Sequence, residues 1–160
     1  VIENNTLLAQ FYSNLGDTYY KQRKMKESDE IFEKALLLDP KNTYVLNNYS
    51  YYLSLRNDSL AKAETMSLLS NKLNPDNSSF QDTYAWVLYK IGKYQDAKEW
   101  LEKAIANGGS SSATILEHYG DVLYKLEENT KAIEYWEKAK TAGTGSEFLE
   151  KKIAEKKLYE

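Results

Sequence analysis

The sequence repeats itself with a period of about 35 residues, and this period constrains the fold more than any other feature. Its two prolines, Pro40 and Pro75, are 35 residues apart. Internal repeats of this length indicate a stacked array of similar units rather than a single irregular domain. A pair of a large residue followed by a small one recurs with the same spacing, at 15–16, 49–50, 84–85 and 119–120.

Further positions align when the chain is shifted by this period. Two series hold small residues: Ser28, Ala63, Ala97 and Ala132, and then Ala35, Ser70, Ala104 and Ala139. A third series is bulky at Phe32, Leu101 and Trp136 and small only at Ser67. Small residues let two helix axes approach closely, and large neighbours fill the grooves between them. We therefore expect helical hairpins, with Gly16 facing Ser28 and Ala85 facing Ala97.

Apolar spacing at i, i+3 and i+4 places these positions on helices. The first helices of the hairpins are expected at 7–22, 43–55, 78–91 and 113–126. The second helices are expected at 25–38, 60–73, 94–106 and 129–141. A final amphipathic helix is expected at about 147–158, with Phe148, Leu149, Ile153 and Leu158 on one side. No segment alternates with period two, so we expect no sheet.

The aligned positions resemble the tetratricopeptide repeat of bacterial proteins, with its W-x2-L-G-x2-Y…A…F…A…P pattern. The first unit carries Tyr12, Leu15, Gly16, Tyr19, Ser28, Phe32, Ala35 and Pro40 at the positions of that pattern. The resemblance implies an all-α fold, a right-handed α-solenoid of four helical hairpins plus a C-terminal capping helix. Its expected parts are a remnant of a preceding repeat at 1–8, repeats at 9–42, 43–77, 78–112 and 113–146, and a capping helix at 147–160.

Composition narrows the possible functions. The net charge is -3, whereas nucleic-acid binders usually carry a basic stripe. The chain has no Cys and one His, which excludes thiolate zinc sites and leaves little room for a metal centre. His118, Glu117 and Asp121 could contribute to a metal or acid–base site, but an ordinary polar helix surface is the favoured interpretation. We expect no enzymatic activity, no cofactor and no metal.

The resemblance implies that the first helix of each hairpin lines the concave surface. The candidate partner-binding residues on that surface are Tyr20, Tyr44, Asn47, Asn48, Tyr51, Asp82, Trp86, Tyr89, His118 and Tyr124. Aromatic side chains there offer a large contact area with a polar handle. The alternative for Tyr20, Tyr89 and Tyr124 is packing between neighbouring helices. The carboxylate clamp of some tetratricopeptide co-chaperones is excluded, because Asp17 would repel a carboxylate at the matching position.

These observations predict a non-catalytic scaffold that holds a partner protein or an extended peptide on the concave face. Alternatively, the chain is a structural, self-assembling segment of a larger multi-repeat envelope protein, associating through its N-terminal repeat face. We expect no nucleic-acid partner and no membrane insertion of this segment. The localisation expected by weak analogy is the bacterial envelope or periplasm, with the cytoplasm as the alternative. The substitution Trp86→Ala is expected to weaken partner binding without lowering the melting temperature.

Overall fold

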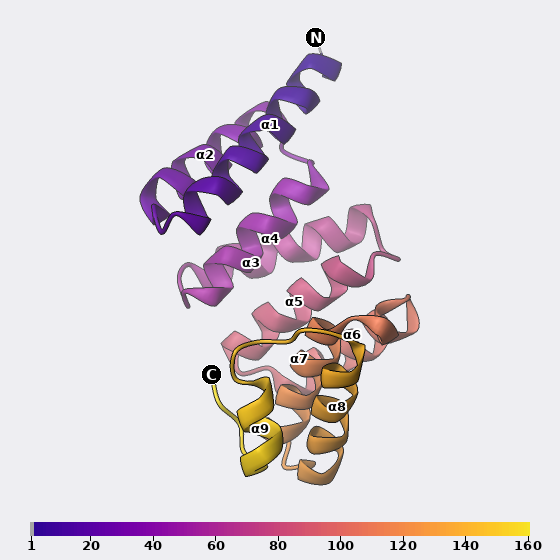
Figure 1. The fold of residues 1–160 in the computed structure, drawn as a ribbon. Coiled ribbons are helices and arrows are strands. Elements are labelled where there is room, and N and C mark those ends of the chain that lie inside the picture. Colours follow the sequence, from indigo (N-terminus) through magenta and orange to yellow (C-terminus); the bar gives the residue numbers. More distant parts are fainter. Residues whose placement is uncertain (1) are drawn as a thin grey trace. The chain divides into compact units, whose positions relative to one another are not determined.

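The computed structural model describes residues 2–160, and its helices follow the expected repeat (Figure 1). The first helices of the hairpins are α1 (Ile2–Lys21), α3 (Thr43–Leu55), α5 (Ser78–Ile91) and α7 (Ala113–Lys125). The second helices are α2 (Met25–Leu38), α4 (Leu60–Leu73), α6 (Tyr94–Ala106) and α8 (Asn129–Ala142). A 3-10 turn, η1 (Gly109–Ser111), precedes α7, and α9 (Leu149–Glu155) follows α8.

This architecture is an all-α solenoid of helical hairpins, as the sequence predicts. Residues 2–160 contain helices, turns and bends and no strand. None of the helices in that range combines the length and the apolar character that a membrane span requires. The chain divides into two compact units. Unit 1 extends to Pro75 and contains α1–α4, and unit 2, Asp76–Glu160, contains α5–α9.

Small residues set the distance between the two helices of a hairpin. In the first hairpin the Ser28 hydroxyl donates a hydrogen bond to the Gly16 carbonyl at 2.9 Å. A Cβ atom added at Gly16 would lie 2.9 Å from the Phe32 ring, and one at Gly120 would lie 2.5 Å from the Trp136 indole. The two small series of the repeat are buried throughout their four copies, as are Phe32, Ser67, Leu101 and Trp136. The contact between Gly16 and Ser28 that the period predicts is therefore confirmed.

Side-chain caps explain why three of the first helices begin where they do. The carbonyl oxygen of the Asn42 side chain accepts a hydrogen bond from the Val45 amide at 3.2 Å. Asn77 does the same for Phe80 at 3.1 Å. The Ser112 hydroxyl caps α7. Because a capped N-terminus satisfies backbone donors that have no intrahelical partner, the Asn that follows each Pro-containing turn sets the start of the next helix.

The two ends of the chain differ from expectation. The helix α1 begins at Ile2, five residues before the start at residue 7 that the sequence predicts, so residues 3–6 are helical. Val1 lies outside the described residues. The last helix is shorter than the expected 147–158: it spans 149–155 and ends at Lys156, whose φ of 51° is left-handed. Residues after Lys156 consequently leave the helix axis and reach other parts of unit 2.

Candidate partner-binding site

The ten candidate side chains lie on the first helices of their hairpins, five in each unit. Unit 1 carries Tyr20 on α1 and Tyr44, Asn47, Asn48 and Tyr51 on α3. Unit 2 carries Asp82, Trp86 and Tyr89 on α5 and His118 and Tyr124 on α7. The two sets form separate clusters, each with its own contacts.

In unit 1 two aromatic candidates, Tyr20 and Tyr51, contact Tyr52, for which the sequence suggested no role. The ring of Tyr20 stacks on Tyr52, with centroids 3.8 Å apart, and the Tyr51 ring lies 6.0 Å from Tyr52. Tyr20 and Tyr51 are half-buried, whereas Tyr44 is 54% exposed. The α3 helix therefore presents Tyr44 to solvent, and Tyr20 packs between α1 and α3, the structural role that its repeat register allows.

The two amide candidates in unit 1 belong to a polar chain between α3 and α1. The side-chain amide of Asn48 donates to the Asp17 carboxylate at 3.4 Å, and that of Asn47 donates to the side-chain oxygen of Asn48 at 3.2 Å. Burial raises the pKa of Asp17, against the opposing effects of a Tyr52 hydrogen bond, the Lys21 charge and the Asn48 hydrogen bond. A peptide that accepts a hydrogen bond from the Asn48 side chain would have to displace the Asp17 carboxylate.

In unit 2 the candidates form a continuous stack of rings. Trp86 lies between Tyr89 and His118, with centroid distances of 4.7 Å and 4.0 Å and interplanar angles of 10° and 16°. All three are buried, Trp86 with 7% of its surface exposed. The Lys90 ammonium lies 5.0 Å from the centroid of the Trp86 ring. Such stacks favour particular ring orientations, so Trp86 orients its neighbours Tyr89 and His118.

His118 is paired with a carboxylate from the neighbouring hairpin. Its Nδ1 lies 2.8 Å from the Asp82 carboxylate, and both residues are buried. Burial disfavours the imidazolium, but the negative charges of Asp82, Asp121 and Glu117 outweigh burial and raise the pKa of His118 above its usual 6.5. The pair joins α5 to α7.

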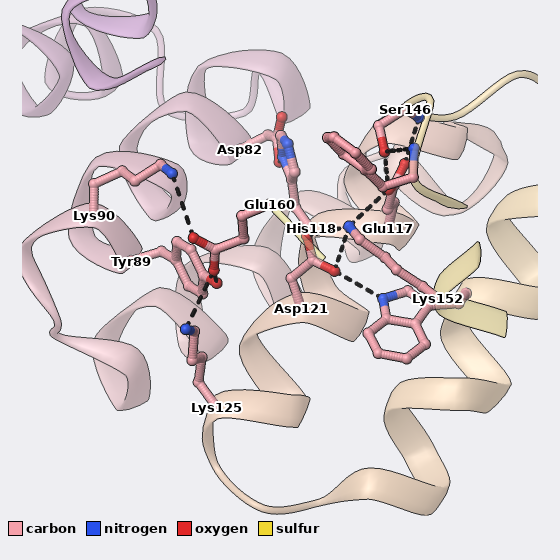
Figure 2. A network of polar contacts seen from close by, with 12 residues as sticks. Asp82, Tyr89, Lys90, Glu117, His118, Asp121, Lys125, Ser146, Lys152 and Glu160 are labelled. Carbon is pink, nitrogen blue, oxygen red and sulfur yellow. Dashed lines mark hydrogen bonds and ion pairs between the residues drawn. The ribbon is translucent and has the colours of Figure 1, made fainter. Parts of the chain in front are cut away.

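The strongest polar cluster of unit 2 centres on Lys152 of α9, which the sequence analysis missed (Figure 2). Its ammonium donates to Glu117 at 2.8 Å and to both Asp121 oxygens at 2.8 Å, and it is 3% exposed. Ser146 adds two hydrogen bonds to Glu117, from its amide at 2.7 Å and its hydroxyl at 2.5 Å. Glu117 and Asp121 therefore both bind the Lys152 ammonium.

A sequence signal for this cluster did exist. Leu149, Lys152 and Ile153 have the i, i+3, i+4 spacing of a buried helix face, so Lys152 falls on the apolar side of α9. Glu117 and Asp121 are four residues apart on α7 and share one face. A lysine on an apolar face and two acids on one face of the preceding hairpin indicate an ion pair between them.

The two carboxyl groups respond differently to burial. Burial opposes the ionisation of Glu117, but hydrogen bonds from Lys152 and Ser146 outweigh it, so its pKa is lowered. Burial raises the pKa of Asp121 to about 6, although the Lys152 charge opposes the rise. Asp121 also accepts a hydrogen bond from the Trp136 indole at 2.8 Å. Lys152 and Trp136 thus fix Asp121 from two helices.

Glu160 lies against Tyr89, another candidate of unit 2 (Figure 2). The Tyr89 hydroxyl donates to the Glu160 carboxylate, whose oxygens lie 3.3 Å from the Lys125 ammonium and 3.9 Å from that of Lys90. Tyr124 lines an open cavity of about 560 Å³ together with Lys125, Leu158 and Glu160. The expected concave surface of unit 2 is therefore partly covered by residues 146–160.

Comparison with known proteins agrees with this architecture. Two family models described as tetratricopeptide repeat match residues 9–42 and 85–147. The chain belongs to the tetratricopeptide repeat family. A TPR repeat-containing protein of Pseudomonas aeruginosa is 28% identical over 85 residues, which are 53% of this chain and 14% of that protein. The type IV pilus assembly protein PilF of the same bacterium is 27% identical over 110 residues, 68% of this chain and 44% of PilF.

Solved tetratricopeptide repeat structures superimpose on most of the chain. The structure of P. aeruginosa PilF superimposes on 86% of this chain, and the superimposed part is 62% of the PilF chain. The TM-score is 0.72 and the sequence identity is 26%. PilW, described as a type IV pilus biogenesis factor, has a TM-score of 0.76 at 18% identity and covers 84% of this chain and 61% of PilW. The chain spans less than half of each curated relative. The PilW likeness shows the fold alone.

Proposed function

We propose that this tetratricopeptide repeat protein is a non-catalytic scaffold that binds a partner protein or an extended peptide on the inner side of its first helices. The observation that carries the proposal is the α3 surface, where Tyr44 is 54% exposed beside the half-buried Tyr51 and Asn48. Aromatic and amide groups are the side chains that anchor peptides at low entropic cost. The pilus assembly role in the name of the similar protein PilF supports a function in assembling proteins.

Site-specific photocrosslinking tests this proposal. A photoreactive phenylalanine analogue replaces Tyr44 on α3 or, as the matched control, Leu37 on α2, which is 83% exposed. Both positions are accessible, but only Tyr44 lies on the proposed face. After irradiation in cells that make the protein naturally, we expect a defined adduct from position 44 and none from position 37, identified by mass spectrometry. Equal adducts from both positions, or an adduct only from position 37, would contradict the proposed face.

A second candidate function is self-association through the N-terminal repeat. The observation that favours it is a group of exposed apolar side chains on α1, where Leu7 is 71% and Phe11 61% exposed. Contiguous apolar surface of this kind marks protein contacts. We expect light scattering to show a concentration-dependent dimer that the double substitution Leu7→Ser and Phe11→Ser abolishes. A monomer at all concentrations would exclude this function.

A further inference from the structure

The Glu160 carboxylate lies in a small receptor built from α5 and α7. Tyr89 donates a hydrogen bond to it, and Lys125 and Lys90 supply positive charge at 3.3 Å and 3.9 Å (Figure 2). The Tyr89 side chain is buried, whereas Glu160 keeps 37% of its side chain exposed. The receptor thus binds a carboxylate at the protein surface, where Glu160 remains partly exposed to solvent.

The receptor side chains are oriented by contacts that do not involve Glu160. The Tyr89 ring stacks on Trp86 and also touches the Tyr94 ring, at a centroid distance of 5.4 Å. The Lys90 ammonium lies over the Trp86 ring, and the Lys125 ammonium lies 5.8 Å from the Tyr89 centroid. Groups that are already held in place lose little entropy when a ligand arrives. The receptor is therefore preorganised for a carboxylate.

Glu160 reaches the receptor on a short non-helical segment. The helix α9 ends at Lys156, and Lys157 donates back to the Lys152 carbonyl at 3.2 Å. The Tyr159 hydroxyl is bonded to Glu155, while Leu158 lines the cavity beside Tyr124. The receptor thus holds an acidic residue that follows a large apolar or aromatic one in a non-helical segment, which is the chemistry of a peptide ligand.

The interactions that hold the Glu160 carboxylate are weak enough for a carboxylate of another peptide to replace it. Burial opposes its ionisation, but the Tyr89 hydrogen bond and the charges of Lys125 and Lys90 outweigh burial and lower its pKa. The carboxylate is therefore charged at neutral pH. Partly exposed ion pairs contribute little net stability, so the tethered Glu160 is held mainly by its high local concentration.

We propose that Tyr89, Lys90 and Lys125 form a binding site for an acidic side chain of an extended partner peptide, which Glu160 occupies in the absence of that partner. This assignment rests on the proposed scaffold function and adds to it the ligand chemistry, a carboxylate preceded by apolar residues. The site differs from the carboxylate clamp of tetratricopeptide co-chaperones, because it uses a tyrosine together with lysines in the last turns of α5 and α7.

The test uses the full chain and a defined peptide. The probe is the acetylated and amidated pentapeptide KKLYE, the sequence of residues 156–160, and its matched control is KKLYQ. Binding is followed by NMR shifts of the Tyr89, Lys90 and Lys125 amides. A short tether gives an effective concentration on the order of millimolar. Because the tethered Glu160 competes with the peptide, we expect wild type to bind KKLYE more weakly than Glu160→Gln does, by about tenfold if the variant binds the peptide with a dissociation constant of about 0.1 mM.

Two further variants identify the receptor. Lys125→Ala in the Glu160→Gln background should abolish binding of KKLYE, whereas Lys131→Ala, a change of the same type at an exposed lysine of α8, should leave it unchanged. Equal binding of KKLYE and KKLYQ, equal binding by wild type and Glu160→Gln, or no binding by Glu160→Gln would overturn the proposal. Each of these outcomes leaves the crosslink at Tyr44 possible, so the scaffold function and the acidic site fail independently.

Discussion

Lys152 neutralises two carboxylates that α7 alone would leave buried and unpaired. The Glu117 and Asp121 side chains are 4% and 3% exposed. Removing one partner of a buried ion pair typically costs about 3–5 kcal/mol. We expect Lys152→Met to lower the free energy of unfolding of unit 2 by about this amount, measured by urea denaturation with tryptophan fluorescence. Lys151→Met, at an exposed neighbouring position, is the matched control and should be nearly neutral.

The same cluster allows a compensation test. Replacing Lys152 by Met together with Glu117→Gln and Asp121→Asn removes the charges with their partner. The triple variant should recover part of the stability that Lys152→Met alone loses, because no buried charge remains uncompensated. A triple variant that is no more stable than Lys152→Met would show that packing rather than charge makes Lys152 necessary.

His118 is the only histidine of the chain, so its ring protons give an unambiguous NMR titration. Asp82 on α5 and Glu117 and Asp121 on α7 face it, and the Lys152 charge is bound to the latter two. We expect a pKa above 6.5, and a lower one in Asp82→Asn. Because the folded-state pKa is the higher one, His118 contributes stability that is complete below the unfolded pKa of about 6.5 and is lost as the pH rises through the folded value.

A histidine pKa at or below 6.5, or one that Asp82→Asn does not lower, would contradict the pairing that joins α5 to α7. The pKa of an unperturbed histidine in an unfolded chain is the reference for the first outcome, and the wild-type pKa is the reference for the second.

The burial of Trp86 revises one expectation from the sequence. From the sequence, Trp86 is expected to contact a ligand, and its loss is expected to leave the melting temperature unchanged. It is 7% exposed and stacked between two rings, so Trp86→Ala is now expected to destabilise the protein as well. The sequence identifies the register of the candidate residues, which is why all ten lie on first helices. It does not reveal that Glu160 contacts the candidate Tyr89, or that Ser146 and Lys152 bind Glu117, because these contacts cross 29 to 71 positions of sequence.

At the scale of the helical elements, Gly120 shows why the small positions of the repeat are required. Replacing glycine by alanine inside a helix normally gains up to about 1 kcal/mol. At Gly120 the new Cβ would lie 2.5 Å from Trp136 and 3.0 Å from the Ala132 carbonyl oxygen. We expect Gly120→Ala to reduce the unfolding free energy by about 1–3 kcal/mol, as overpacking does. A thermal melt with an unchanged or raised midpoint would show that α7 and α8 separate easily.

The helix boundaries were largely predictable from sequence, for reasons that are local. The Asn caps of α3 and α5 lie two residues after the two prolines, and Gly92, with a φ of 88°, ends α5 at the expected residue. The end of α9 was not predictable in this way. Lys156, not a glycine, adopts the left-handed conformation there, and the helix is shorter than its apolar pattern suggests.

At the scale of the whole chain, the two units differ in how well they bury apolar surface. The large exposed apolar residues of the described chain belong to unit 1: Leu7, Leu8, Phe11, Leu37, Tyr44, Leu55 and Leu73. Ser67 also replaces a bulky residue of the repeat there. Burial of apolar surface is the main stabilising contribution to a fold. Unit 1 should therefore be the less stable of the two.

This difference predicts two separable unfolding transitions. The three tryptophans, at 86, 100 and 136, belong to unit 2, so their fluorescence reports on that unit, whereas far-UV circular dichroism reports on both. In urea we expect helical signal to be lost before the fluorescence changes. Repeat arrays with strong coupling between neighbours unfold together, so coincident transitions would show that the coupling exceeds the difference between the units.

The buried ion pair at α9 also has a consequence for building longer arrays from these repeats. A fifth hairpin grafted after α8 would occupy the place from which Lys152 neutralises Glu117 and Asp121. Any such graft needs a basic side chain at the equivalent position, or else the two acids must be replaced by amides at the same time. The two acids of α7 therefore restrict which helices can follow this repeat in an engineered chain: the following helix must place a basic side chain beside them.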